Sequence, residues 1–137
     1  MKILIIDGQS GRIGSQLIES LRKTPPACEH TIIAVGANAL ATSAMLKAGA
    51  DQGATGENAV IVQCRSASII AGPMGIAIAD SLLGEITPAM AIAVGQSSAS
   101  RVLLPSHQCG SLVAGLPSMT RQQLIDAAAA LIRQLCV

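Results

Sequence analysis

The chain has 137 residues, the length of one domain; 50% of them are hydrophobic and only 12% are charged. This composition excludes intrinsic disorder, which requires low hydrophobicity and high net charge. Nine basic residues nearly balance eight acidic ones, and Phe, Tyr and Trp are absent. The chain is therefore not an electrostatic nucleic-acid binder that stacks bases on aromatic rings.

Other features of the composition bear on the cellular compartment. The longest uncharged apolar stretch, residues 67–79, is too short to cross a membrane and contains Pro73 and Gly75. Only four apolar residues separate Lys2 from Asp7, so no signal peptide is predicted. The four cysteines have no C-x-x-C spacing and are predicted to be reduced thiols. The sequence thus predicts a soluble, globular, cytoplasmic protein without a membrane partner.

The first part of the chain alternates between strand and helix patterns. A strand is predicted at residues 2–7, an amphipathic helix at 12–23, a second strand at 31–36 and a second helix at 39–48. The continuous apolar run in the first strand is typical of a central parallel strand that is buried on both faces. This β-α-β-α alternation predicts an α/β domain with a parallel sheet.

Residues 57–66 permit two interpretations. Val60, Ile61 and Val62 favour a strand, and a further strand is predicted at 68–72. A parallel crossover between two such strands needs about a dozen residues, which are not available here. The segment is therefore either one arm of a hairpin or the crossover helix itself. We predict the helix, capped near Thr55, because it maintains the alternation.

Two helices are predicted after the strand at 68–72. The first follows Gly72 and Pro73 and continues through Leu83. The second begins at Thr87, a suitable N-cap, because Pro88 then occupies the first helical position, and it ends near residue 95.

The last part of the chain is expected to contain two strands and a helix. The strands are predicted at 101–105 and 111–116, and the helix from about residue 119, where Thr120 and Gln123 have the spacing of a capping box. The complete pattern predicts a single domain over residues 1–137. Its fold class is α/β, with three layers and a mostly parallel, doubly wound sheet.

A glycine motif lies between the first strand and the first helix. Its residues are Gly8, Gln9, Ser10, Gly11, Arg12, Ile13 and Gly14, with the spacing G-x-x-G-x-x-G. We expect the first glycine to permit a tight turn, the second to let the backbone approach a ligand, and the third to let the helix pack on the sheet. Amide groups at the helix start attract phosphate, and Arg12 adds charge there. The alternative is a tight turn that binds nothing.

Two resemblances concern this loop and the chain as a whole. The loop resembles the opening of dihydrodipicolinate reductase through Gly8, Gly11, Arg12, Ile13 and Gly14. That resemblance implies a loop that binds the pyrophosphate of NADH or NADPH. The whole chain resembles a small, uncharacterised bacterial family of Rossmann-like proteins, in segments 7–18, 38–51, 53–59 and 72–88. This second resemblance implies a Rossmann-like fold and no mechanism.

Two features depart from the dinucleotide-binding pattern. An acidic residue is expected to end the second strand and hold the ribose, but this chain has Asn38 there. Asn38 can either hydrogen-bond a ribose or cap the next helix, and we predict the cap. Asp7 lies beside the phosphate position and would repel an anion, unless it binds a metal or points away. We predict that it accepts hydrogen bonds from the amides of the loop itself.

A second glycine-bearing turn contains Gly72, Pro73 and Gly75. It faces the first loop if the strand order is 3-2-1-4-5, and it would then cover a nicotinamide, a nucleobase or a small acid. Close helix packing explains its glycines equally well. Asp80 would lie on an otherwise apolar helix, so we expect it to be paired, at an interface or functional. Glu85 is interpreted as a solvated loop residue or a capping partner.

His107 and Cys109 follow the strand at 101–105. A Cys/His pair suggests a nucleophile with its base, or two metal ligands. The sequence offers no third orienting residue and no complete ligand set. We therefore assign neither a catalytic nor a metal site.

Two functions of different classes follow from these features. The first is a protein that binds a nucleotide or dinucleotide, with NAD or NADP as the cofactor, and acts as an oxidoreductase. The second is a non-catalytic module that binds a small ligand or a partner protein. The predicted binding residues are Gly8, Gln9, Ser10, Gly11, Arg12, Ile13, Gly14, Asn38, Gly72, Pro73 and Gly75. Because the apolar content exceeds what so small a domain can bury, we also predict a homodimer through residues 75–94.

Overall fold

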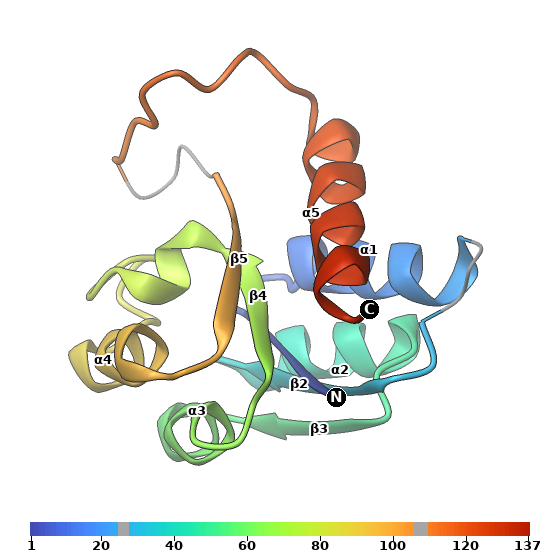
Figure 1. Cartoon of the computed structure of the whole chain (residues 1–137). Helices are drawn as coiled ribbons and strands as arrows, with labels where there is room; N and C mark the ends of the chain where they lie inside the picture. Colours follow the sequence, from blue (N-terminus) through green and yellow to red (C-terminus); the bar gives the residue numbers. More distant parts are fainter. Residues whose placement is uncertain (25–27, 106–109) are drawn as a thin grey trace.

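The structure is a computed structural model that describes residues 1–24, 28–105 and 110–137. These residues form one five-stranded sheet between two layers of helices (Figure 1). The strands are β1 (Lys2–Asp7), β2 (Thr31–Gly36), β3 (Gln52–Thr55), β4 (Ile69–Pro73) and β5 (Ser100–Leu104). The helices are α1 (Arg12–Lys23), α2 (Ala39–Ala48), α3 (Glu57–Cys64), the 3-10 turn η1 (Met74–Ala77), α4 (Pro88–Gln96) and α5 (Arg121–Leu135).

The sheet is doubly wound. Its strand order is β3-β2-β1-β4-β5, and every neighbouring pair is parallel. Figure 1 shows α1, α2 and α5 on one side of the sheet and α3 and α4 on the other. The predicted fold class, an α/β Rossmann-like domain with a parallel sheet, is therefore confirmed.

Strand β1 joins the two hydrophobic cores. Ile3 and Ile5 pack with α1, α2 and α5, whereas Leu4 and Ile6 pack with α3 and α4. All four side chains are fully buried. The prediction of a central strand buried on both faces is confirmed, and it explains why the run has no polar alternation.

Local capping chemistry sets the starts of three helices as predicted. The side chains of Asn38, Thr87 and Thr120 accept hydrogen bonds from the third residue of α2, α4 and α5 respectively. Residues 57–66 contain the predicted crossover helix rather than a hairpin arm. This helix follows Gly56 and has no side-chain cap, so the predicted cap near Thr55 is wrong.

One strand was not predicted and another prediction was wrong. Strand β3 has only four residues, Gln-Gly-Ala-Thr, which are mostly exposed at the sheet edge and lack an apolar run. Residues 111–116 form no strand: Leu112 is 88% exposed, and the Leu116 amide closes a turn onto the Val113 carbonyl. Residues 111–116 lie between β5 and α5 and belong to no helix or strand (Figure 1).

The predicted helix through Leu83 is also wrong. After the short turn η1 the chain forms a series of turns, in which Leu82 and Leu83 have φ angles of 54° and 57°. Local hydrogen bonds replace the helical ones: the Ser81 hydroxyl donates to the Gly75 carbonyl, and the Asp80 amide donates to the Ile86 carbonyl. Asp80 is exposed on this loop, so the predicted cost of burying its charge does not arise.

No helix in the described part of the chain is long and apolar enough to span a membrane.

The close approach of β4 to β1 generates a stability prediction. A Cβ at Gly72 would collide with the Ile6 carbonyl oxygen, so the Gly72→Ala variant is expected to lose about 3 kcal/mol of unfolding free energy. The control is Gly95→Ala in α4, where a Cβ meets no atom within 4 Å. This control should gain about 0.5 kcal/mol from helix propensity. Urea unfolding measures both changes, and equal stabilities of the two variants would contradict the prediction.

Candidate functional site

The carboxyl ends of the strands form the edge at which doubly wound sheets bind ligands. The strand order reverses at β1, between β2 and β4, and this switch point is where a crevice is expected. A pocket of about 150 Å³ lies there. It is lined by Asp7, Gly8, Gln9, Ser10, Arg12, Ile13, Pro73, Leu82 and Arg121. The structure thus brings most of the glycine loop together with Pro73 of the second glycine-bearing turn.

The other predicted residues do not line this pocket. Close packing explains why the glycines among them cannot carry a side chain. Gly11 has a φ of 71°, and a Cβ there would lie 2.8 Å from the Ala41 Cα of α2. A Cβ at Gly14 would crowd the Met45 sulfur, also in α2. Both glycines let helix α2 pack closely, so packing alone already requires a glycine at position 11, and the expected approach of a ligand stays a prediction.

Close packing also explains the glycines of the second glycine-bearing turn. Gly72 leaves room for the Ile6 carbonyl of β1, and a Cβ at Gly75 would lie 3.0 Å from the Ser81 hydroxyl oxygen. Close packing, the alternative that the sequence left open, accounts for these two glycines. Only Pro73 of this turn contacts the pocket.

Asp7 fixes the glycine loop through two hydrogen bonds. Its Oδ1 accepts a hydrogen bond from the Gly8 amide at 2.7 Å, and its Oδ2 accepts one from the Gly14 amide at 2.8 Å. The prediction that Asp7 binds the amides of its own loop is confirmed. Burial raises the pKa of Asp7; the two amide bonds oppose this shift, and the charge of Glu85 adds to it.

Glu85 is a site residue that sequence reasoning missed. Its Oε1 accepts a hydrogen bond from the Gln9 amide at 2.6 Å, and its Oε2 accepts one from Asn38 Nδ2 at 2.6 Å. Asn38 also caps α2 through Oδ1 and donates from Nδ2 to the Gln9 carbonyl. The predicted cap is confirmed, and the Asn38 side chain is fully engaged with protein groups.

Arg121 is the second residue that sequence reasoning missed, although it has a sequence signal. It occupies the first position of α5, and Arg12 occupies the first position of α1. Cations are unfavourable near a helix N-terminus, because that end already carries a partial positive charge. Neither helix has an acidic residue in its first turn. Both arginines line one pocket, together with the Asp7 carboxylate.

A larger, apolar groove adjoins the small pocket. Its volume is about 680 Å³, and Ile13 and Arg121 line both cavities. The remaining lining residues come from the end of β5, the connection to α5 and α5 itself: Leu104, Pro105, Leu112, Val113, Leu116, Pro117, Ser118, Met119 and Leu124. The charged pocket and the apolar groove therefore meet at two side chains.

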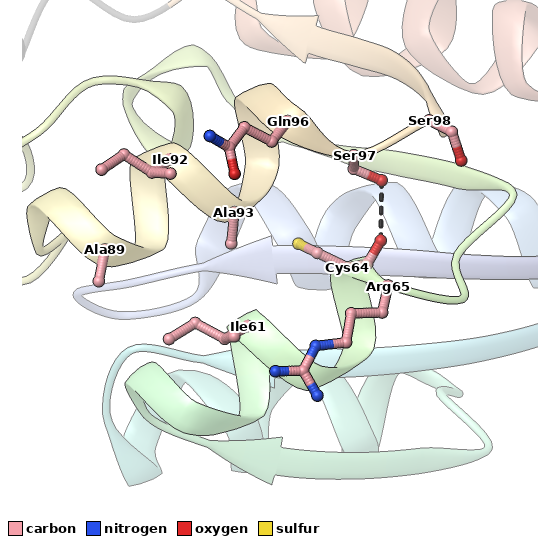
Figure 2. Close-up of a pocket in the computed structure, with 9 residues that line it drawn as sticks. All are labelled: Ile61, Cys64, Arg65, Ala89, Ile92, Ala93, Gln96, Ser97 and Ser98. Carbon is pink, nitrogen blue, oxygen red and sulfur yellow. Dashed lines mark hydrogen bonds between the residues drawn. The ribbon is translucent and has the colours of Figure 1, made fainter.

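A third cavity lies between α3 and α4, away from the glycine loop. Figure 2 shows Ile61 of α3 and Arg65, the residue that follows α3, opposite Ile92 and Ala93 of α4. Its volume is about 650 Å³. Burial raises the pKa of the Cys64 thiol to about 11, so this thiol is neutral at physiological pH and is a poor nucleophile.

His107 and Cys109, the predicted Cys/His pair, lie outside the described residues.

The loop contacts of Asp7 generate the next prediction. The Asp7→Ala variant leaves two buried amides without an acceptor and should lose about 3 kcal/mol of unfolding free energy. The control is Asp126→Ala, which removes an exposed carboxylate of α5 and should change stability by about 0.5 kcal/mol or less. Thermal or urea unfolding checks both, and a stability of Asp7→Ala equal to that of the wild type would show that the loop does not need this carboxylate.

No curated protein matches the chain. Among solved structures, a dodecameric FMN-dependent Ubix-like decarboxylase from Escherichia coli O157:H7 is 18% identical, with a TM-score of 0.43 over 100% of this chain and 77% of its own. An NADPH-dependent quinone oxidoreductase from Escherichia coli is 20% identical, with a TM-score of 0.49 over 94% of this chain and 63% of its own. A family model matches residues 2–137, and the chain belongs to that family, described as a domain of unknown function (DUF3842).

Proposed function

We propose that this protein binds a nucleotide, with a phosphate in the pocket at the glycine loop and an apolar ring in the adjoining groove. The observation that carries the proposal is the convergence of two helix N-termini, each beginning with an arginine, on one small polar pocket. Placing Arg12 and Arg121 there costs about 0.3–1 kcal/mol each unless an anion compensates. A bound phosphate would turn this repulsion into attraction.

The loop also retains donors for an anion. Among the described residues, the Ser10 and Arg12 amides have no hydrogen-bond acceptor, whereas Asp7 and Glu85 take those of Gly8, Gln9 and Gly14. The Ser10 side chain is exposed beside them and lines the pocket. Two backbone donors, a hydroxyl and two guanidinium groups are the groups that recognise a phosphate.

The adjoining groove suits the rest of a nucleotide. Its volume of about 680 Å³ is within the range of small-molecule sites, and its lining is largely aliphatic. A ring that enters it passes Ile13 and Arg121, which border both cavities. The guanidinium of Arg121 could stack on such a ring as well as pair with a phosphate.

A more specific form of the proposal assigns a reaction to the protein. NAD and NADP are the cofactors predicted from the sequence, and an oxidoreductase would have to oxidise one of the reduced forms. The alternative function is a non-catalytic module that binds its ligand at the same edge of the sheet. Turnover of NADH or NADPH with an added electron acceptor separates these two forms.

The arginines generate a binding prediction. AMP, FMN, ATP, NAD(H) and NADP(H) are tested by thermal shift, because a ligand that binds only the folded state raises its melting temperature. At least one should stabilise the wild type. The Arg12→Gln and Arg121→Gln variants should each weaken that ligand about tenfold, the effect of one lost charged contact. Since the chain lacks Phe, Tyr and Trp, a co-purified nucleotide also stands out in its ultraviolet spectrum.

The matched control is Arg65→Gln, which removes the same charge from the residue that follows α3 at the other cavity. It should bind as the wild type does. If no nucleotide stabilises the protein, or if all three variants lose affinity equally, the glycine loop is only a tight turn.

Self-association is a second proposal, carried by the face of α3 and α4. Within the predicted segment 75–94, Leu83 is 96% exposed and Ile92 is 55% exposed. Ile92 borders the groove between the two helices, whose lining is mostly apolar (Figure 2). Because an exposed apolar patch of this kind marks an interaction surface, we propose that two copies of the chain meet here.

The self-association proposal is tested by light scattering at micromolar concentration. The wild type should be a dimer, and Ile92→Lys should be a monomer, because a charge would be buried at the interface. Leu131→Lys, which alters a similarly exposed side chain of α5, is the control and should remain a dimer. A monomeric wild type, or the same mass for both variants, would contradict the proposal.

A further inference from the structure

Glu85 lies where a dinucleotide would cross the crevice. In the dinucleotide arrangement the pyrophosphate sits on the glycine loop, and a ribose contacts the end of the second strand. Glu85 joins these two places, because its carboxylate accepts from the Gln9 amide of the loop and from the Asn38 side chain after β2. We infer that Glu85 is a specificity-determining residue that admits nucleoside monophosphates and excludes dinucleotides.

The inference rests on the nucleotide binding proposed above, replaces its NAD(P) form and specifies the ligand class as a nucleoside monophosphate. The carboxylate of Glu85 already accepts the hydrogen bond that the Gln9 amide would offer to a second phosphate. Its negative charge also repels a phosphate brought to that side of the loop. Asp7 lines the small pocket itself, but its two oxygens accept hydrogen bonds from the Gly8 and Gly14 amides, which partly compensate its charge there.

The position of Glu85 is held by its surroundings. Asn38, one of its two partners, is fixed by its cap on α2. The loop that carries Glu85 is anchored by the buried side chains of Ser81 and Leu82 and by the hydrogen bond from the Ile86 amide to the Ser81 carbonyl. Glu85 also packs against Gly8, where a Cβ would lie 2.9 Å from its Oε1. A ligand would therefore have to displace an anchored group, rather than a freely rotating side chain.

The small pocket lies beside Glu85, which is not among its lining residues. The pocket is bordered by Ser10, Arg12 and Arg121, and it continues past Ile13 into the apolar groove. One phosphate can use these donors, and the rest of the ligand then extends away from Glu85. The ligand class that fits is a phosphate monoester with an attached ring system, such as AMP or FMN.

The experiment compares a nucleoside monophosphate with a dinucleotide in the wild type and in Glu85→Ala. The probes are AMP, FMN and NADH, and calorimetric titration gives each Kd. The wild type should bind AMP or FMN about tenfold or more tightly than NADH, the size expected for one like-charge contact. Glu85→Ala should lower the Kd of NADH about tenfold and change the Kd of the monophosphate by about threefold or less.

Two further variants keep the test interpretable. Glu57→Ala removes an exposed carboxylate whose hydrogen-bond partner is the Thr87 hydroxyl, so it changes the net charge equally without touching the loop. It should bind all three probes as the wild type does. Glu85→Gln keeps the size of the side chain and removes its charge, and it provides the same comparison if Glu85→Ala does not fold. It should also tighten NADH.

The outcomes separate this inference from the proposed function. If AMP or FMN binds through Arg12 and Arg121 but the Glu85 variants leave the Kd of NADH unchanged, the inference is wrong and the proposed function stands. Weaker binding of NADH to Glu85→Ala also overturns it, since Glu85 would then hold a ribose. If neither the wild type nor a Glu85 variant binds any probe, both fail. NADH binding that appears only in the Glu85 variants supports the inference.

Discussion

The two hydrogen bonds of the Asp7 carboxylate determine the shape of the candidate site. They connect the last residue of the central strand to the first residue of the glycine loop and to the first turn of α1. A buried carboxylate is costly without such donors, so strand, loop and helix can adopt only a few relative positions. Gly14 is part of the same constraint, because any side chain there would separate α1 from Asp7 and from Met45 of α2.

The second connection spans the strand-order reversal. Glu85 comes from the segment between β4 and α4, yet its partners are the loop after β1 and the residue after β2. The two halves of the sheet are thus bridged above the switch point by one carboxylate. The acidic residue that the dinucleotide pattern places after β2 is absent from that position, and an acid from elsewhere in the chain lies nearby instead. Under the proposed specificity, the location of this charge in space, rather than its place in a motif, decides which ligand can enter.

Much of the fold could be predicted from the sequence because its determinants are local. The apolar run of β1, and the caps at Asn38, Thr87 and Thr120, act within a few residues of themselves. Strand β3 was not predicted because its four residues lie at the edge of the sheet and have no apolar pattern. The segment after β4 has the composition of a buried helix, but Leu82 and Leu83 take left-handed conformations that no residue type there indicates.

The candidate site could be predicted only in part, for a related reason. The glycine loop is contiguous, so its residues could be identified directly. Glu85 and Arg121 reach the loop only through tertiary packing, and their separations from it along the chain exclude any local signal of that contact. Arg121 at a helix start was an electrostatic anomaly that indicated an unidentified partner, but not where that partner lies.

The dependence of the pocket on α5 has a consequence for biosynthesis. Helix α5 docks on α1, where the Arg133 guanidinium donates to the Ser20 carbonyl at 2.8 Å, and this docking positions Arg121 beside the loop. The ribosome makes the glycine loop well before Arg121, the residue that completes the pocket. A nascent chain can therefore assemble β1, α1 and β2 early and still lack a complete binding site. A pocket lined by both arginines therefore forms only after α5 has been synthesised and has docked on α1.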